Sequence, residues 1–453
     1  MHSFAITTLG CKVNQYESQQ IRQLLQNSGF TLTGLKQNPE LVIINSCCVT
    51  HSASAKSRQY IQRAQKLNPQ SVVVVCGCLA STSFGELGDV NENVCVLGDR
   101  NSLVSALRRI ICLLKTTTDL SMANTFNYNH IKAEIAHKIK AKNDLDNNLK
   151  LPLLTSFEGH TRAFLKIQNG CNGYCSYCII PHTRPDVRSK PLKIALREAR
   201  SLIESGHKEI VLTGVFLGSY GQDTVIRRKW PGQRNDQLVE LLYELAQIKG
   251  LERIRLSSLE PADITERLLD VFCQNHNIMP HLHLSLQSGS DDILKKMRRQ
   301  YRAGQFEETV EMVKERLWNP AITADIIVGF PGETEMDFEK TVTLAEKTGF
   351  SKMHVFPFSA RKGTAAAKMK NRVTIQLMKK RLRRMHQLDE MLKIKFRRQF
   401  INREVMVLME SSGYGRCERY FKVYLDDESL KANDLIKVRI RGEREDGAVG
   451  DIL

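Results

Sequence analysis

A chain of 453 residues has room for about three domains and a large hydrophobic core, so it needs no disulfides to fold. Its 66 Lys and Arg outnumber 49 Asp and Glu, and the formal charge of +17 favours a polyanionic partner, although a solubilising surface charge would give the same total. The spread of its twelve cysteines, the polar start of the chain and its short apolar runs argue against a secreted disulfide scaffold or a membrane protein. We therefore expect a soluble cytoplasmic protein with no membrane partner.

The first part of the chain alternates apolar strands with amphipathic helices, an order that predicts a parallel α/β sheet. We expect strands at residues 4–10, 41–46, 71–77 and 93–98. Three cysteines, Cys11, Cys47 and Cys78, each directly follow one of these strands. Because the carboxyl ends of parallel strands lie along one edge, where such folds bind ligands, the three thiols should meet at that edge.

Residues 116–155 are polar and poor in aromatic side chains, which is typical of a linker. A short helix around Ile131, Ile135 and Ile139 is the one element that we expect within this segment. The linker separates an N-terminal domain, residues 1–115, from a second alternating segment.

Six further strands, each followed by a helical or polar stretch, predict a partial (β/α)6 barrel at residues 156–390. They are expected at 163–168, 209–214, 253–258, 281–287, 322–330 and 352–358. The chemistry of such a fold lies at the carboxyl ends of its strands. A cysteine-rich loop follows the first of these six strands, so it is placed where an active site is expected.

A basic helix and a small all-β barrel are expected to close the chain, at residues 391–453 with the helix starting ahead of them. Bases dominate residues 379–403, in which Leu382, Met385, Leu388 and Leu392 recur at helical spacing. A helix with one apolar face and an opposite basic face suits binding to an RNA backbone, although a basic face that is only solvated would give the same pattern. Short strands at 404–453 suit a barrel that binds RNA or one that only braces its neighbour.

The stretch CNGYCSYC holds Cys171, Cys175 and Cys178 at C-x3-C-x2-C spacing in a tight, polar loop. Zinc would need a fourth ligand, which His182 could supply. A 4Fe–4S cluster held by three thiolates instead leaves one iron open to another ligand. The position of this loop after the first strand of a β/α repeat favours the cluster.

These residues resemble a known family, the radical S-adenosylmethionine (SAM) methylthiotransferases, which end in a small RNA-binding TRAM barrel. The resemblance runs in order along nearly the whole chain, through TLGCKVNQYES, INSCCVT, CGCLA, FLKIQNGC, CSYCIIP, LTGVFLGSYG, SSLEP, HLHLSLQSGSD, ADIIVGFPGET and FPFSARKGTAA. The opening motif and the Val49-Thr50 pair look most like the branch that acts on N6-threonylcarbamoyladenosine in tRNA. Sister branches act on isopentenyladenosine in tRNA or on an aspartate of a ribosomal protein.

The resemblance implies two 4Fe–4S clusters and SAM as cofactors. Cys171, Cys175 and Cys178 would hold the radical cluster, and Cys11, Cys47 and Cys78 an auxiliary cluster, while Cys48 and Cys76 are read as small buried side chains. Contacts to SAM are implied at Tyr177, Thr213, Gly214, Gln287, Ser288 and Asp325. Ser288 has the alternative reading of a helix cap, and Gly214 that of a simple turn.

The implied reaction places a methylthio group on C2 of N6-threonylcarbamoyladenosine next to the anticodon. Its C2–H bond is too weakly acidic for a general base, so the family uses a radical from reductive cleavage of SAM. The implied partners are the tRNA anticodon loop and an electron donor such as flavodoxin or ferredoxin, and we expect a monomer. The other readings are methylthiolation of isopentenyladenosine or of a protein side chain, and a non-catalytic, metal-containing RNA-binding protein.

One position departs from the family pattern. Arg184 is followed by Pro185, where the family usually has glycine, and proline fixes φ near −65° and removes an N–H. If the glycine serves through a positive φ, this loop must differ here. His281 and His283 alternate on a strand as metal-binding pairs do, but we expect them to pack inside the barrel.

Overall fold

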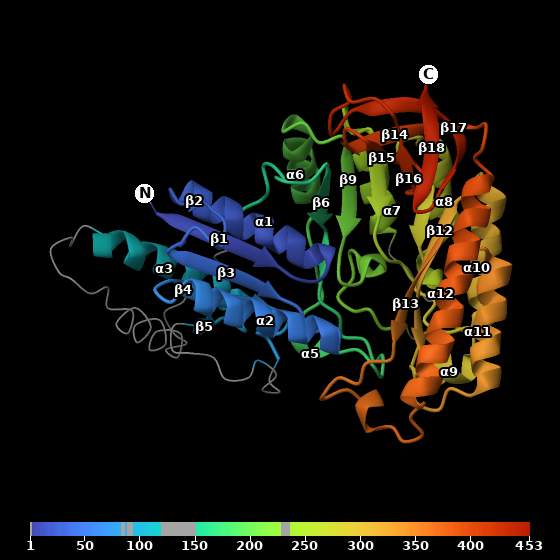
Figure 1. Cartoon of the computed structure of the whole chain (residues 1–453), viewed down its shortest axis with the longest axis horizontal. Coiled ribbons are helices and arrows are strands. Elements are labelled where there is room, and N and C mark those ends of the chain that lie inside the picture. The colour runs from blue at the N-terminus through green and yellow to red at the C-terminus, as the bar shows by residue number, and fades with distance from the viewer. Residues whose placement is uncertain (1, 83–86, 88–93, 119–150, 228–235) are drawn as a thin grey trace. The chain divides into compact units, whose positions relative to one another are not determined.

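A computed structural model describes residues 2–82, 87, 94–118, 151–227 and 236–453. The chain folds into two compact units (Figure 1). The first comprises Met1–Leu154, Cys178–Pro185 and Ala360–Gly363, and the second comprises Thr155–Tyr177, Asp186–Ser359 and Thr364–Leu453. The helix expected around Ile131 lies outside the described residues. Over those residues, no helix combines the length and the hydropathy that crossing a bilayer requires.

The first unit contains the expected parallel sheet. Its strands are β1 (Ser3–Thr8), β2 (Thr31–Leu32), β3 (Leu41–Ser46), β4 (Val72–Gly77) and β5 (Val94–Val96), in the order β2-β1-β3-β4-β5. All neighbours pair in parallel. The two-residue strand β2 was not predicted, because two residues are too few to show a period.

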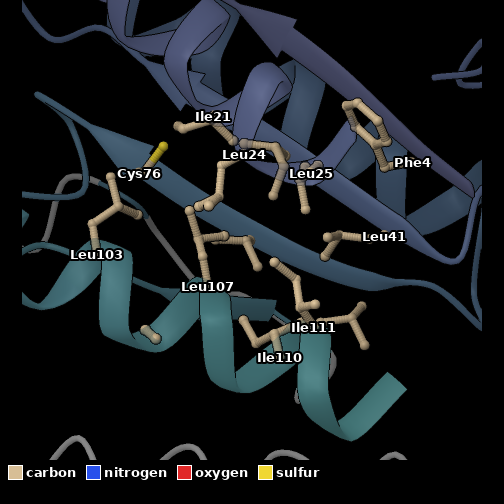
Figure 2. Packing of buried hydrophobic residues seen from close by; sticks show 14 of the residues in the cluster. Phe4, Ile21, Leu24, Leu25, Leu41, Cys76, Leu103, Leu107, Ile110 and Ile111 are labelled. Carbon is tan, nitrogen blue, oxygen red and sulfur yellow. The ribbon is translucent and has the colours of Figure 1, made fainter. Parts of the chain in front are cut away.

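Helices cover both faces of this sheet: α1 (Lys12–Asn27), α2 (His51–Leu67) and α3 (Arg100–Thr118). Figure 2 shows side chains of α1 and α3 packed against one face, around Phe4 and Leu41. On the other face, Ile61 of α2 packs against Val42 and Val73. Since both faces are covered, β3 and β4 are buried at every residue, which explains why they read as unbroken apolar runs.

The second unit contains the six expected barrel strands: β6 (Arg162–Lys166), β9 (Glu209–Thr213), β10 (Arg253–Leu256), β11 (His281–His283), β12 (Ala321–Val328) and β13 (Lys352–Pro357). They form two parallel sheets, β10-β9-β6 and β11-β12-β13. Parallel bridges from Ile254 to Ile278 and from Leu259 to Leu284 join the two sheets beside β10 and β11. The partial (β/α)6 barrel is therefore confirmed.

Helices follow these strands in β/α alternation. They are α6 (Leu192–Glu204), α7 (Gln237–Ala246), α8 (Glu266–Gln274), α9 (Asp291–Lys296), α10 (Ala303–Arg316) and α11 (Glu335–Thr348), with short 3-10 turns at Leu217–Ser219, Pro261–Asp263 and Ala366–Lys368. Two of these helices, α9 and α10, lie between β11 and β12. A two-stranded ribbon of β7 (Gln168–Asn169) and β8 (Arg188–Ser189) flanks the cysteine loop.

The predicted basic helix is α12 (Ile375–Arg398), which runs alongside β13 in Figure 1. It begins before the predicted residue 379, because Thr374 caps its start by accepting the N–H of Leu377, and it ends at Arg398, before the predicted residue 403. Met385, Leu388 and Leu392 are buried as expected, and two of its bases, Arg381 and Arg397, are buried as well. The helix also runs through the domain boundary that we placed after residue 390, and that boundary stays a prediction.

The chain ends in a closed five-stranded barrel, which confirms the small all-β domain. Its strands are β14 (Glu404–Ser411), β15 (Tyr414–Cys417), β16 (Lys422–Tyr424), β17 (Leu435–Arg444) and β18 (Gly447–Ile452), in the order β14-β15-β16-β18-β17. Its core continues into Phe396 and Phe400 at the end of α12. The short strands β15 and β18 were not resolved from the sequence.

Two arginines of β10, Arg253 and Arg255, attach this barrel to the β/α sheet. Arg253 donates to the carbonyls of Arg416 and Met406, at 2.9 and 2.6 Å. Arg255 donates to the carbonyls of Glu418 and Cys417, at 2.8 and 2.9 Å. The terminal barrel is thus fixed at the amino end of the sheet, opposite to the carboxyl end where a β/α barrel has its chemistry (Figure 1).

Candidate functional site

Three cysteines lie at the carboxyl edge of the first unit's sheet, as predicted. Cys11 begins α1 directly after β1, Cys47 follows β3, and Cys78 follows β4. Cys47 and Cys78 are 5% and 3% exposed. Burial raises the pKa of the Cys47 thiol to about 11, and the neighbouring Cys78 and Cys11 add to the rise if they are ionised.

Gly10 makes room for this edge. Its φ is +97°, and a Cβ at this position would come 2.8 Å from both Cβ and Sγ of Cys47. No L side chain fits such a space, so the turn that leads into Cys11 requires glycine. By contrast, Cys76 packs in the apolar core shown in Figure 2, and Cys48 packs against Leu79, which agrees with their reading as small buried side chains.

A separate segment, Cys178–Pro185, belongs to the first unit and brings an arginine to the same edge. Ile179 packs against Cys48 and Cys78, and the short helix α5 (Ile180–Thr183) ends just before Arg184. Arg184 has φ −143° and ψ 63°, outside the helical region, as expected for a residue that precedes proline. The unusual Pro185 thus coincides with the point where the chain leaves the helix.

The Arg184 side chain is buried among polar groups of α1. Its guanidinium donates to both carboxylate oxygens of Glu17 at 2.7 Å and to Oδ1 of Asn14 at 3.0 Å. Its Nε lies 3.5 Å from Sγ of Cys78. Burial alone would lower the pKa of Arg184, but the Glu17 carboxylate raises that pKa well above the arginine range, so the side chain is a fixed cation.

The cysteine-rich loop of the second unit follows β6 and β7. Gly170 opens it with φ +83°, where a Cβ would come 1.8 Å from the carbonyl oxygen of Asp186. Ser176 fixes its far side, because its N–H donates to the carbonyl of Met297 and its hydroxyl to that of Lys296, both just past α9 or at its end. Burial raises the pKa of the Cys171 thiol to about 11, while the N–H of Gly173, 3.4 Å from its sulfur, opposes that rise.

A second buried arginine contacts this loop. Arg299 lies with one nitrogen 3.3 Å from Sγ of Cys175 and 3.5 Å from the hydroxyl of Tyr177. Its other terminal nitrogen donates to Glu260 at 2.6 Å. Burial raises the pKa of Glu260, and Arg299 opposes this rise. The third motif cysteine, Cys178, lies in the first unit, where its sulfur accepts the N–H of Ile180 at 3.4 Å.

The residues predicted to contact SAM come from several parts of the second unit: Thr213 and Gly214 lie at the end of β9, Gln287 and Ser288 follow β11, Asp325 lies within β12, and Tyr177 lies in the cysteine loop. Thr213 ends β9 and is 2% exposed, and a Cβ at the next residue, Gly214, would come 2.9 Å from Cβ of Gln168. Gln287 has a positive φ of 66°, and its N–H donates to the carbonyl of Asp325 at 2.7 Å. Backbone strain in a side-chain-bearing residue is common at functional sites.

Ser288 behaves differently from its neighbours. It is 1% exposed, and its hydroxyl accepts the N–H of Ser290, the residue before α9. This bond shapes the turn before α9, but the N-cap of that helix is Ser290, so Ser288 is not its cap. His283 lies 3.3 Å from the Asp325 carboxylate and 2.9 Å from the Thr323 hydroxyl, while His281 is buried against Tyr420. Both histidines are thus packed among other side chains of the second unit, as expected.

Sequence reasoning gave no role to Glu17, Arg184, Glu260 or Arg299. One signal was available for α1, because Cys11, Asn14 and Glu17 are spaced three residues apart and so lie along one face of a helix. Buried polar residues on an otherwise apolar face indicate a specific partner. For the two arginines no local pattern exists, since their partners are far away in the sequence.

The donor chemistry of both cysteine sets fits iron–sulfur clusters better than disulfides or packing, since none of these six cysteines forms a disulfide and all lie on turns or loops that follow strands. A Cβ at Gly10 would fill the space beside Cys47 Sγ. Throughout the described ranges, no three or more His, Cys, Asp or Glu side chains gather tightly enough to hold a single metal ion. The assignment of the six cysteines and of the SAM contacts stays a prediction.

Comparison with known proteins agrees with this architecture. Residues 165–345 match the radical SAM superfamily, and residues 3–98 match the family described as "Uncharacterized protein family UPF0004". The structure resembles that of the radical SAM methyltransferase TsrM from Kitasatospora setae, with cobalamin and a 4Fe–4S cluster bound, at TM-score 0.50 over 79% of this chain and 75% of that chain. At 13% identity this likeness shows the fold alone.

Curated relatives match at full length. The threonylcarbamoyladenosine tRNA methylthiotransferases MtaB of Bacillus subtilis and Thermotoga maritima are 34% and 33% identical, covering 97% and 99% of this chain and 94% and 96% of theirs. The tRNA-2-methylthio-N(6)-dimethylallyladenosine synthase of Alkaliphilus oremlandii is 32% identical, over 99% of this chain and 92% of its own. Because such identity extends over almost the whole of each protein, the chain belongs to the radical SAM methylthiotransferase family.

Proposed function

We propose that this enzyme transfers a methylthio group to C2 of N6-threonylcarbamoyladenosine next to the anticodon of tRNA. The observation that carries the proposal is full-length similarity, at 32% to 34% identity, to five threonylcarbamoyladenosine tRNA methylthiotransferases. The relatives named for dimethylallyladenosine match at 30% to 32%. The cysteine edge of the first unit and the cysteine loop of the second supply the donors that such a reaction needs.

Membership of the radical SAM superfamily implies a 4Fe–4S cluster and SAM. When bound, the two together supply a radical that can take hydrogen from a C–H bond that no side-chain base could ionise. Cys171, Cys175 and Cys178 would hold this cluster. In the proposed division of labour, Cys11, Cys47 and Cys78 hold a second cluster that serves sulfur transfer, which is a finer claim than superfamily membership implies.

The residues of the chain position and shield these groups. Arg299, held by Glu260, keeps Cys175 in place and puts a positive charge beside its sulfur. Thr213 and Gly214 at the end of β9, Gln287 after β11 and Asp325 within β12 would contact the methionine and ribose of SAM. The burial of Cys47 and Cys78 keeps water away from two of the three sulfurs that we assign to sulfur transfer, whereas Cys11 is exposed.

The tRNA is proposed to bind α12 and the terminal barrel. Lys379, Lys380 and Arg383 are exposed on α12. On the barrel, Tyr414 and Tyr424 pair at 5.8 Å, with Lys422 5.1 Å above the first ring and Arg444 4.0 Å above the second. The aromatic rings suit stacking on unpaired nucleobases, and the basic side chains beside them suit contact with RNA phosphates. Since the barrel lies at the amino end of the sheet, a bound tRNA must extend along the unit to reach the carboxyl end.

Binding of tRNA should therefore depend strongly on salt. If about six phosphates are contacted, log K should fall against log salt concentration with a slope of about −4, at about 0.7 per single-strand phosphate. Changing Lys379, Lys380 and Arg383 to Gln should reduce that slope by about 2. Fluorescence anisotropy with an anticodon stem-loop measures both values. The matched control changes Lys193, Arg197 and Arg200, exposed on α6, and should leave the slope unchanged.

The function is tested by tRNA nucleoside analysis in a bacterial host that lacks its own methylthiotransferases. Expression of the chain should produce 2-methylthio-N6-threonylcarbamoyladenosine, detected by mass spectrometry, and the Cys175→Ala variant should not. Appearance of 2-methylthio-isopentenyladenosine alone, or of a methylthiolated ribosomal protein alone, would replace the proposed substrate by that of a sister branch.

Three expectations stay predictions at this point. They are the domain boundaries at 115, 155 and 390, a monomeric enzyme in the cytoplasm, and an electron donor such as flavodoxin or ferredoxin.

A further inference from the structure

A buried ion pair lies against the cysteine edge of the first unit and has no part in the function proposed above. Arg184 and Glu17 are 3% and 7% exposed, and the guanidinium meets both oxygens of the carboxylate at 2.7 Å. Burying an ion pair carries a large desolvation cost, and apolar residues of similar volume often serve stability as well or better. A contribution to stability alone therefore does not explain why the Arg184–Glu17 ion pair is buried here.

The pair touches one of the three thiols directly. Nε of Arg184 lies 3.5 Å from Sγ of Cys78, while its two terminal nitrogens bind Glu17 and Asn14 on α1, the helix that Cys11 begins. One guanidinium thus connects two of the three cysteine positions. All of these groups belong to the first unit, so their geometry is internal to it.

We propose that Arg184 and Glu17 set the reduction potential of an auxiliary cluster on Cys11, Cys47 and Cys78, with Arg184 as the positioning residue of Cys78. This inference rests on the proposed function, because it needs the auxiliary cluster. A cluster held by three thiolates carries net negative charge, and each added electron makes it more negative. A cation beside one sulfur favours reduction, and the carboxylate behind the cation opposes it.

The second unit repeats the arrangement. Arg299 lies 3.3 Å from Sγ of Cys175 and is held by Glu260 at 2.6 Å. Each predicted cluster site therefore has one cysteine beside a buried arginine whose charge is offset by a glutamate. Arg381 and Glu333 form a third buried pair, 2.8 Å apart, whose arginine also binds Glu335. That pair serves as a matched control, since the hydrogen bonds of Arg381 go to the Glu333 and Glu335 carboxylates and to the Glu333 carbonyl, and its guanidinium packs over the Phe338 ring rather than beside a cysteine.

The test isolates the auxiliary cluster by using the full chain with alanine at Cys171, Cys175 and Cys178, reconstituted with iron and sulfide. Redox titration followed by electron paramagnetic resonance gives the midpoint potential. Arg184→Met should lower the ratio of reduced to oxidised cluster at a fixed ambient potential at least tenfold, which is a shift of about 59 mV for one electron. Glu17→Gln should raise that ratio at least tenfold, because it removes only the opposing charge.

If the two residues served only packing, Arg184→Met and Glu17→Gln would not shift the midpoint potential in opposite directions. Arg184→Lys keeps the charge without the planar fork, so it should stay near the parent potential with a broadened cluster signal. Arg381→Met and Glu333→Gln should leave the potential unchanged. Should Arg184→Met fail to fold, Glu17→Gln still decides, since it changes one atom. Shifts of the same sign, or no larger than those of the Arg381 and Glu333 controls, would overturn the inference. A parent protein with no iron would instead overturn the auxiliary cluster of the proposed function, and this inference with it.

Discussion

Alanine at Cys11, Cys47 and Cys78 together is expected to abolish methylthiolation of tRNA while reductive cleavage of SAM continues. These thiols are proposed to hold the cluster that serves sulfur transfer, whereas the radical step depends on the other three cysteines. Anaerobically reconstituted wild-type protein should hold about eight irons and the variant about four, as expected for two 4Fe–4S clusters. Iron and sulfide analysis and a SAM-cleavage assay on one preparation measure both effects.

Two further variants separate cluster loss from damage to the fold. Alanine at Cys171, Cys175 and Cys178 should also leave about four irons but should lose SAM cleavage as well. Alanine at Cys48 and Cys76, which pack in apolar surroundings, should keep about eight. If the wild type holds only about four irons, and the Cys11 set does not change that number, the first unit binds no cluster and sulfur transfer by this route is wrong.

The fold could be predicted from the sequence because its parallel strands are buried on both faces. Strands such as β3 and β4 read as unbroken apolar runs, and the helices between them show a 3.6-residue period. Once a parallel sheet is inferred, topology alone brings residues after each strand to one edge. The positions of Cys11, Cys47 and Cys78 followed from this rule, whereas the short strands β2 and β15 carry too few residues to show any period.

The surroundings of the cysteines could not be predicted in the same way. Arg184 meets Glu17 across 167 residues, and Arg299 meets Cys175 across 124. Neither arginine differs in local sequence from the many exposed bases of this strongly basic chain. Only the folded structure shows that these two charges are buried. Because burying a charge costs free energy unless it is paired, a buried charge indicates a specific partner, whereas an exposed one does not.

Arg255→Met is expected to destabilise the second unit by about 3–5 kcal/mol, because it leaves a buried carboxylate without its nearest partner. Glu209 starts β9 at 0% exposure, and Nε of Arg255 meets it at 2.7 Å. In the pairing register Glu209 lies between Arg162 and Arg253, so a row of alternating charges crosses the three strands. Loss of Arg255 also frees the carbonyls of Cys417 and Glu418, so hydrogen exchange should rise first in β14 and β15.

The pH dependence of this effect has a definite sign. Burial alone would raise the pKa of Glu209, but Arg255 and Arg253 hold it below the ordinary value of 4.5. The charged pair therefore stabilises the wild type above about pH 4.5, and that contribution is lost as the pH falls through the depressed folded-state pKa. In Arg255→Met the burial effect prevails and the pKa of Glu209 rises, so the gap between variant and wild type should be widest at neutral pH and narrow in acid. Urea unfolding at neutral pH and at acidic pH measures this difference in the free energy of unfolding between the variant and the wild type.

Two comparisons decide whether the charge, rather than the packing, is responsible. The double variant Glu209→Met with Arg255→Met removes both members of this pair, while Arg253, 3.6 Å from Glu209 in the wild type, keeps its two carbonyl contacts, so the double variant should be more stable than Arg255→Met by about 1 kcal/mol or more. Arg267→Met breaks an ion pair with Asp236 whose arginine is 69% exposed, and should change stability by no more than about 0.5 kcal/mol. If the double variant is less stable than Arg255→Met, the Glu209 side chain stabilises the fold even when its ion pair with Arg255 is absent. The terminal barrel would then be held by the four carbonyl contacts of Arg253 and Arg255 rather than by the charge beneath them.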